Sequence, residues 1–383
     1  MSETMIRRND PVLKSRRIVV KVGSSVLTAS DELGVNRRVL GRIASQVAKL
    51  REEGRQVVMV SSGAIAAGVK RLGLKGIPKA VPERQAAAAV GQPILMEAYG
   101  RAFKQRGIET AQVLLIHSDL DERSRFLNAC NTFQALINKG VLPIVNENDT
   151  VSIEEIRFGD NDTLAAQTAQ IVQAGLVIIL SDVAGLYDED PRRSKMARLI
   201  PRVEGLPKEI TSVAGTSPNP LAHGGMRTKV EAVNILNKVG ISTLIVRGRD
   251  PNIIERVVMG EPLGTLFVPN GARLKGKKGW IGTTAKTRGW LKLDSGAVNA
   301  MLKRGKSLLP SGVLSVGGNF RFGDVVEIRD TQGVAFGRGL ANYSSDDATR
   351  IAGKQTKEIA SILGSKDYDE IIHRNNFVLI EEE

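Results

Sequence analysis

The chain has 383 residues, and at roughly 100–200 residues per domain this length predicts two or three domains. Hydrophobic residues make up 42% and charged residues 25%, which is typical of a globular chain and excludes a disordered one. A single cysteine, Cys130, excludes an intramolecular disulfide and a cysteine-built zinc site, and three scattered histidines argue against a histidine-built one. The formal net charge of +13 favours anionic partners, namely phosphates, carboxylates or nucleic acid.

The first 17 residues carry charges and lack the apolar core of a signal peptide. The longest apolar runs, such as residues 176–180, have the length of a strand and are too short to cross a membrane. We therefore expect a cytoplasmic protein with no membrane association.

Residues 15–268, the predicted first domain, alternate short runs rich in valine and isoleucine with longer helical patterns. The strand candidates are residues 17–22, 56–60, 112–116, 141–145, 176–180 and 243–246. Residues 36–53 predict a helix, because apolar residues recur on one face between a capping Asn36 and Gly54. Residues 63–106 predict Ala-rich helices with a break near Gly91-Gln92-Pro93.

This alternation predicts an α/β fold, an αβα sandwich with a mainly parallel sheet that helices cover on both faces. Ligands of such sheets bind at the carboxyl ends of the strands. The segments that directly follow each strand are therefore where chemistry is expected.

The pattern changes near Pro269. Residues 269–286 predict a basic linker, and short runs separated by glycine-rich turns predict a small β-rich domain over residues 287–365. Residues 366–383 are expected to form a C-terminal tail.

Two loops after strands have the composition of anion-binding sites. The first is Lys21-Val22-Gly23-Ser24-Ser25, where glycine admits a phosphate and Lys21 supplies positive charge. The second is Ser61-Ser62-Gly63-Ala64, whose backbone N–H groups at a helix start suit a carboxylate or phosphate. The alternatives are a strand-end lysine beside a turn and simple N-capping by Ser62. No GxxxxGK[ST] pattern occurs, which disfavours a Walker-type NTPase.

A third segment concentrates carboxylates and amides, from Asn146-Glu147-Asn148-Asp149 to Gly159-Asp160-Asn161-Asp162. Asp149 has the charge to pair with a substrate ammonium, Asn161 can hydrogen-bond a polar substrate group, and Asp162 can orient a catalytic lysine. The alternative is a solvated acidic hairpin in which residues 160–162 cap a helix over residues 163–172. The DxDxDG spacing of an EF-hand is absent.

Two later segments suit a nucleotide. Residues 181–191 follow the most apolar strand and are rich in turn residues. Residues 223–229, His-Gly-Gly-Met-Arg-Thr-Lys, open a helix that runs to Val239. Lys229 in the first turn opposes the helix dipole, so an anion-binding role is favoured over a structural one.

Taken together and in this order, these loops resemble the amino-acid kinase family, and within it the branch that phosphorylates glutamate at the start of proline biosynthesis. Residues 287–363, with Leu308-Leu309-Pro310-Ser311-Gly312-Val313, are similar to a PUA domain. Two positions depart from the family pattern: Ser61 stands where threonine is frequent, and His223 stands where threonine is usual.

The resemblance implies transfer of the γ-phosphoryl group of ATP to the side-chain carboxylate of L-glutamate. Lys21 and Lys229 would balance the charge of the migrating phosphoryl group, and Asp162 would hold both lysines. The implied glutamate-binding residues are Ser62, Asp149 and Asn161. The implied nucleotide-binding residues are Lys21, Gly23, Ser181, Asp182, Gly224, Gly225, Met226 and Lys229. Mg²⁺ would arrive with ATP, held mostly by phosphates and water and by no dedicated protein site.

The resemblance also implies a homo-oligomer, a dimer or tetramer, and feedback inhibition by proline near residues 151–160. An RNA-binding role for the PUA-like domain is the alternative from another class, since basic residues predominate over residues 275–306. Aromatic residues make up only 4%, so stacking surfaces for RNA are scarce, and a solvated linker face also explains the charge. A nearer alternative is a kinase of the same fold that acts on aspartate, N-acetylglutamate or UMP.

Overall fold

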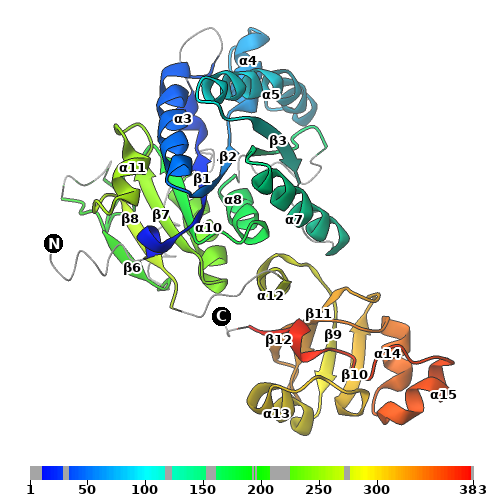
Figure 1. Cartoon of the computed structure of the whole chain (residues 1–383). Helices are drawn as coiled ribbons and strands as arrows, with labels where there is room; N and C mark the ends of the chain where they lie inside the picture. The colour runs from blue at the N-terminus through cyan, green and yellow to red at the C-terminus, as the bar shows by residue number, and fades with distance from the viewer. Residues whose placement is uncertain are drawn as a thin grey trace. The chain divides into compact units, whose positions relative to one another are not determined.

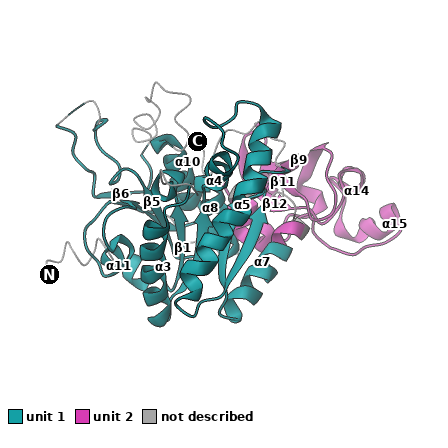
Figure 2. Cartoon of the chain, turned by 90° about the horizontal axis from the view of Figure 1, so that it is seen from above, with its two compact units in different colours: residues 1–117, 128–273 teal, residues 118–127, 274–383 magenta. Residues whose placement is uncertain are grey.

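The structure, a computed structural model, describes residues 11–28, 34–116, 123–151, 161–191, 194, 196–207, 225–270 and 277–380. Its contacts divide the chain into two compact units, one of residues 1–117 and 128–273, the other of residues 118–127 and 274–383 (Figure 2). Within the described part, no helix has the length and apolar character needed to span a bilayer.

The first unit is built on an eight-stranded sheet in the order β3-β4-β2-β1-β5-β7-β8-β6 (Figure 1). Its strands are β1 Arg17–Val22, β2 Gln56–Ser61, β3 Thr110–Leu115, β4 Leu142–Glu147, β5 Leu176–Ser181, β6 Arg202–Glu204, β7 Ser242–Arg247 and β8 Thr265–Val268. All neighbouring pairs are parallel except β7 and β8, which are antiparallel. The predicted αβα sandwich with a mainly parallel sheet is confirmed.

Helices cover both faces of this sheet (Figure 1). They are α2 Ser24–Leu27, α3 Arg37–Glu52, α4 Ala64–Arg71, α5 Val81–Lys104, α7 Arg123–Asn138, α8 Asn161–Ile171, α10 Met226–Lys238 and α11 Ile253–Val258. Helix α3 begins where its sequence predicts, because the Asn36 side chain accepts a hydrogen bond from the Val39 N–H at 3.1 Å. Helices α3, α5 and α11 share one hydrophobic core, whereas α8 packs against α10.

The alternation of side chains along β1 determines where Lys21 lies. Ile18, Val20 and Val22 belong to the core beneath α3 and α5. Successive strand side chains point to opposite faces, so Val19 and Lys21 lie on the other face, against α8. The carboxyl end of the central strand thus places a lysine among α8 and α10.

The predicted break near Gly91-Gln92-Pro93 is wrong, because α5 continues from Val81 to Lys104 with Pro93 inside it. Proline removes one helical hydrogen bond, but close packing of α5 on α4 holds the helix together across it. A Cβ atom on Gly91 would lie 1.8 Å from the Ala64 carbonyl oxygen, and one on Gly68 would lie 1.7 Å from that of Ala87. The chain turns instead between α4 and α5, where Gly73 adopts a φ of +67°.

The second unit contains a five-stranded sheet in the order β10-β9-β11-β12-β13. Its strands are β9 Thr287–Leu293, β10 Val313–Gly318, β11 Val325–Arg329, β12 Ala335–Leu340 and β13 Phe377–Leu379. The helical segments are α12 Lys277–Gly279, the π-helical η1 Trp280–Thr284, α13 Ser295–Arg304, η2 Pro310–Gly312, α14 Ser345–Ile351, η3 Thr356–Glu358, α15 Ile359–Leu363 and η4 Arg374–Asn376. The unit has its own core, which includes Leu291, Val326 and Ile359.

Two segments of this unit are more structured than their sequences suggest. In the expected linker, Trp280 and Ile281 are buried within η1. In the expected tail, Ile371 and Ile372 join the core, and β13 pairs with β12. Strand β13 lies in the apolar run Phe377-Val378-Leu379-Ile380, a strand-like pattern that the sequence analysis left unassigned within the expected tail.

Candidate active site

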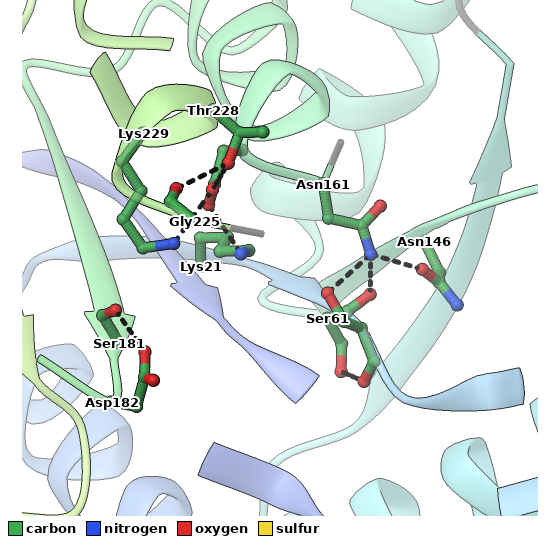
Figure 3. Close-up of polar contacts among 11 residues, drawn as sticks. Lys21, Ser61, Asn146, Asn161, Ser181, Asp182, Gly225, Thr228 and Lys229 are labelled. Atoms are coloured by element: carbon green, nitrogen blue, oxygen red, sulfur yellow. Dashed lines mark hydrogen bonds and ion pairs between the residues drawn. The ribbon is translucent and has the colours of Figure 1, made fainter. Parts of the chain in front are cut away.

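Three elements bring two lysines onto one carboxylate (Figure 3). Lys21 from the end of β1 places its Nζ 2.6 Å from Oδ1 of Asp162, in the first turn of α8. Lys229 from the first turn of α10 places its Nζ 3.3 Å from Oδ2 of the same carboxylate. Thr228 also donates its hydroxyl to this Oδ2, at 2.8 Å. The sequence-predicted catalytic residues therefore lie together.

This cluster brings two lysines and one aspartate together in a buried setting. The Asp162 side chain is fully buried, and both lysines are 4% exposed. Burial alone would raise the pKa of Asp162, but the charges of Lys21 and Lys229 outweigh it and lower that pKa to about 2. Burial lowers the pKa of Lys229, an effect that Asp162 opposes and Lys21 reinforces. Two buried ammonium groups that meet at one point of the site favour the binding of an anion, because both would stabilise its negative charge.

A second cluster of amides and hydroxyls is built around Asn161, next to Asp162 in the chain. The Asn161 Nδ2 group shares its two hydrogens among three acceptors, the Ser61 carbonyl oxygen at 2.9 Å, the Ser62 hydroxyl at 2.8 Å and Asn146 Oδ1 at 3.0 Å (Figure 3). These contacts join the carboxyl ends of β2 and β4 to the start of α8. Ser62 and Asn161, two of the three expected glutamate-binding residues, are therefore in direct contact.

The Asn161 oxygen is the unsatisfied atom of this cluster. Oδ1 is shielded from solvent and has no hydrogen-bond partner among the described residues. A buried acceptor without a partner costs roughly 1–3 kcal/mol, and a bound ammonium or amide donor would offset that cost. The Asn161 oxygen is therefore available to accept a hydrogen bond from a ligand, such as a substrate amino group.

Asp149, the third expected glutamate-binding residue, lies just beyond β4 and is half-buried. Burial, assisted by the nearby charge of Glu147, raises the pKa of Asp149 to about 7. Among the described residues, no hydrogen bond or ion pair joins Asp149 to the Asn161 cluster. A bound ammonium group would pair with the Asp149 carboxylate and favour its ionised form.

Several of the expected nucleotide-binding residues are connected to Lys229 through charge or through their position at the start of α10. Ser181 ends β5 and donates its hydroxyl to Asp182 at 3.1 Å, and the exposed Asp182 carboxylate acts electrostatically on Lys229. Gly225 immediately precedes α10, and Met226 is the first residue of that helix. The Gly225 carbonyl accepts from the Thr228 hydroxyl at 3.1 Å. Gly224 and residues 152–160, where the proline effect was expected, lie outside the described residues.

Gly23 contributes space, because its N–H already donates to the Leu180 carbonyl at 3.1 Å. A Cβ atom here would lie 3.1 Å from that oxygen and 3.8 Å from the Lys21 ammonium. The glycine therefore keeps the region beside Lys21 open.

Sequence reasoning did not assign roles to several residues of these clusters. Thr228 and Asn146 stand inside motifs that the sequence singled out, and their polar character was the signal. Gln92 and Tyr99 gave no signal, because they belong to the long α5 helix. Gln92 nevertheless accepts from Asn146 at 2.8 Å, and Tyr99 donates to the Ser61 hydroxyl at 2.9 Å.

Each of the two units is similar to a known protein family. Residues 16–247 match the model of the amino acid kinase family, and residues 289–363 match that of the PUA domain. The chain is 48% identical over 372 residues to a glutamate 5-kinase of Thermus thermophilus, covering 97% of this chain and 99% of that protein. It is 46% identical over 373 residues to a glutamate 5-kinase of Geobacter sulfurreducens, covering 97% and 100%. The chain therefore belongs to the amino acid kinase family, within it to the glutamate 5-kinases, and carries a PUA domain beyond its kinase unit.

Proposed function

We propose that this chain transfers the γ-phosphoryl group of ATP to the side-chain carboxylate of L-glutamate, giving γ-glutamyl phosphate and ADP, the first step of proline biosynthesis. The observation that carries the proposal is the buried pair of lysines on Asp162 beside the unsatisfied oxygen of Asn161. Family membership and the similarity to glutamate 5-kinases along nearly the whole chain support it.

Lys21 and Lys229 would stabilise the negative charge of the reacting groups. Phosphoryl transfer through a loose transition state needs positioning and electrostatic stabilisation more than covalent help. Lys21 and Lys229 would stabilise the negative charge on the migrating group and on its donor and acceptor oxygens. Asp162 would hold both ammonium groups in position, since it contacts each of them.

Glutamate would bind at the amide cluster. The Asn161 oxygen would accept from its α-ammonium, Asp149 would pair with that charge, and Ser62 would bind the substrate as a hydroxyl donor. ATP would lie against Gly23, Ser181, Asp182 and the segment from Gly224 to Lys229.

Mg²⁺ would accompany ATP and neutralise part of the phosphate charge. Among the described residues, no three His, Cys, Asp or Glu side chains lie together as a metal site. Oxygen donors at the nucleotide side, such as Asp182, fit an ion held mainly by phosphates and water.

The test is turnover with Mg-ATP and a panel of acceptors: glutamate, aspartate, N-acetylglutamate and UMP. Hydroxylamine traps an acyl phosphate as a hydroxamate, and ADP release reports any transfer. We expect a hydroxamate with glutamate alone. ADP release with another acceptor and none with glutamate would keep the kinase assignment and overturn the substrate.

Proline is the inhibitor that we propose for the same site. It shares the α-carboxylate and α-ammonium positions of glutamate, so it would compete for Asn161 and Asp149. We further propose a homo-oligomer, a dimer or tetramer, to be measured by light scattering. The cytoplasm, which supplies both ATP and free glutamate, is the proposed compartment.

We also propose the kinase domain as residues 15–268, with residues 269–286 leading to the second domain at 287. The burial of Ile371 and Ile372 and the pairing of β13 support extending this second domain from residue 365 to at least 380.

RNA binding by the second unit is the other candidate function. Exposed basic side chains favour it, namely Lys278, Lys286, Arg288, Lys303, Arg304 and Lys306. Trp290 is the nearby aromatic residue, and the guanidinium of Arg329 lies 5.1 Å from its ring centre. Filter binding to single-stranded RNA at several salt concentrations tests this role, since contacts to phosphates give a steep salt dependence.

A further inference from the structure

Side-chain amides form a continuous chain that ends at the candidate glutamate site. It starts at Gln112 in β3, passes through Gln92 in α5 and Asn146 in β4, and reaches Asn161 in α8. We propose that Gln92 is a positioning residue: it fixes the polarity of this amide chain and thereby turns the Asn161 oxygen toward the substrate ammonium. This inference rests on the proposed function.

Each link in the amide chain has good hydrogen-bond geometry. The Gln92 Nε2 group donates to Gln112 Oε1 at 2.9 Å, and Asn146 Nδ2 donates to Gln92 Oε1 at 2.8 Å. Asn161 Nδ2 donates to Asn146 Oδ1 at 3.0 Å. Every amide between the two ends therefore donates on one side and accepts on the other.

One backbone group sets the direction of the whole chain. The Ser61 carbonyl can only accept a hydrogen bond, so the Asn161 atom 2.9 Å from it must be the nitrogen. Asn146 then presents its oxygen to Asn161 and its nitrogen to Gln92. Gln92 in turn accepts this hydrogen bond with its oxygen. Figure 3 shows this arrangement for Asn161 and Asn146.

The direction matters because it determines which Asn161 atom is left for a ligand. With both amide hydrogens committed, Oδ1 remains without a partner among the described residues. If the Asn146 amide were reversed, its N–H group would face the N–H group of Asn161, and the two donors would repel each other. Rotation of Asn161 would relieve that clash but offer donors to the substrate ammonium, which itself only donates.

Helix α5 holds Gln92 rigidly enough for this role. The neighbouring Gly91 packs so closely on α4 that a Cβ atom would lie 1.8 Å from the Ala64 carbonyl. Tyr99, two helical turns beyond Gln92 and on the same face, donates to the Ser61 hydroxyl at 2.9 Å. One face of α5 thus supports both ends of the Asn161 cluster.

Three substitutions at one position separate polarity from packing. Gln92→Glu still accepts from Asn146, and the exposed Gln112 can turn its amide to donate to the new carboxylate. Gln92→Leu removes the acceptor and leaves the direction of Asn146 undetermined. Gln92→Lys offers only donors and so favours the reversed Asn146. Gln105→Leu, an exposed glutamine just beyond the end of the same helix, is the matched control.

The measurements are the KM for glutamate, the KM for ATP and the melting temperature of the full chain, with hydroxamate as product. We expect the KM for glutamate to rise roughly tenfold in Gln92→Leu and further in Gln92→Lys. Gln92→Glu is expected to restore most of the affinity for glutamate. The KM for ATP should stay near the wild-type value in all three variants, and Gln105→Leu should match the wild type throughout.

Other outcomes overturn the inference in distinguishable ways. If Gln92→Glu and Gln92→Leu raise both KM values and lower the melting temperature equally, Gln92 acts only in packing. Unchanged KM values for glutamate in all variants would exclude the positioning role while the proposed function stands. A folded wild-type chain that forms no hydroxamate from glutamate would overturn the proposed function and this inference with it.

Discussion

Lys229 has an unusual position for a basic residue, because it lies in the first turn of α10, where the helix dipole disfavours positive charge. Its partner Asp162 also contacts Lys21, so the two lysines share this carboxylate. We expect a bound phosphoryl group to stabilise this arrangement, because two buried ammonium groups attract an anion.

Replacing Lys229 by alanine should remove this transition-state stabilisation. We expect kcat to fall on the order of 10²- to 10³-fold, while ATP binding survives in part through the other nucleotide-binding residues. The matched control is Lys238→Ala at the exposed end of the same helix, which should leave kcat unchanged. Wild-type turnover in Lys229→Ala would remove this lysine from the catalytic set.

Asp149 should give glutamate binding a pH dependence. Because its pKa is raised to about 7, the free protein holds this carboxyl protonated below that pH and ionised above it. Only the ionised form pairs with the substrate ammonium. We therefore expect kcat/KM for glutamate to rise with pH through about 7, and Asp149→Asn to lower the value and abolish the rise. A rise of equal size in Asp149→Asn would assign the titration to another group.

The raised pKa of Asp149 also affects stability: it makes the free energy of unfolding fall with rising pH, whereas kcat/KM for glutamate is expected to rise. Between pH 3.8 and about 7 the folded protein retains the Asp149 proton that the unfolded chain has released. Because the unfolded state binds fewer protons than the folded state, the contribution of Asp149 to the free energy of unfolding decreases as the pH rises across that range. Urea unfolding of the wild type and of Asp149→Asn at pH 5 and pH 8 measures the difference.

At the scale of secondary structure, the crossing of α4 and α5 positions the glutamate side of the site. Helix α4 begins directly after Ser62 and Gly63, and Gly63 adopts a φ of +114° to make this turn. Helix α5 then packs on the start of α4 and supplies Gln92 and Tyr99. Small residues at the crossing allow the backbones to approach each other.

Adding one methyl group at this crossing should therefore destabilise the protein. We expect Gly91→Ala to lower the free energy of unfolding by roughly 1–3 kcal/mol, because its Cβ would overlap the Ala64 carbonyl. Gly100→Ala is the matched control, since the nearest atom to its Cβ would be Thr110 Oγ1 at 3.9 Å. In this control the better helix propensity of alanine should raise stability by about 0.5–1 kcal/mol. Equal effects of the two substitutions in urea unfolding would contradict the packing argument.

At the scale of the whole molecule, each unit has a hydrophobic core of its own. All described residues of the candidate site lie in the first unit. The second unit contributes exposed basic side chains, and with them a share of the net charge of +13. We therefore expect catalysis to belong to the first unit, and the proposed interaction with RNA to belong to the second.

A chain shortened to residues 1–270 should consequently retain glutamate phosphorylation. We expect it to fold and to form hydroxamate with an unchanged KM for glutamate. Circular dichroism and the melting temperature establish folding, and the hydroxamate assay establishes activity. A shortened chain that is folded but inactive would show that the second unit takes part in the reaction.

The sequence by itself predicted the αβα sandwich with its mainly parallel sheet, because local periodicity marks the longer strands and helices, but it did not reveal the short strands β6 and β8. It also singled out Lys21, Asp162 and Lys229 as catalytic candidates, because they stand in motifs that resemble those of the amino acid kinase family. Only the tertiary structure decided that α5 continues through Pro93 and that Gln92 reaches Asn146. A glutamine inside a long helix has no local signature of function. Its role arises when α5 packs on α4 beside β4, which depends on backbone approach at Gly91 and on partners 54 residues away in the chain.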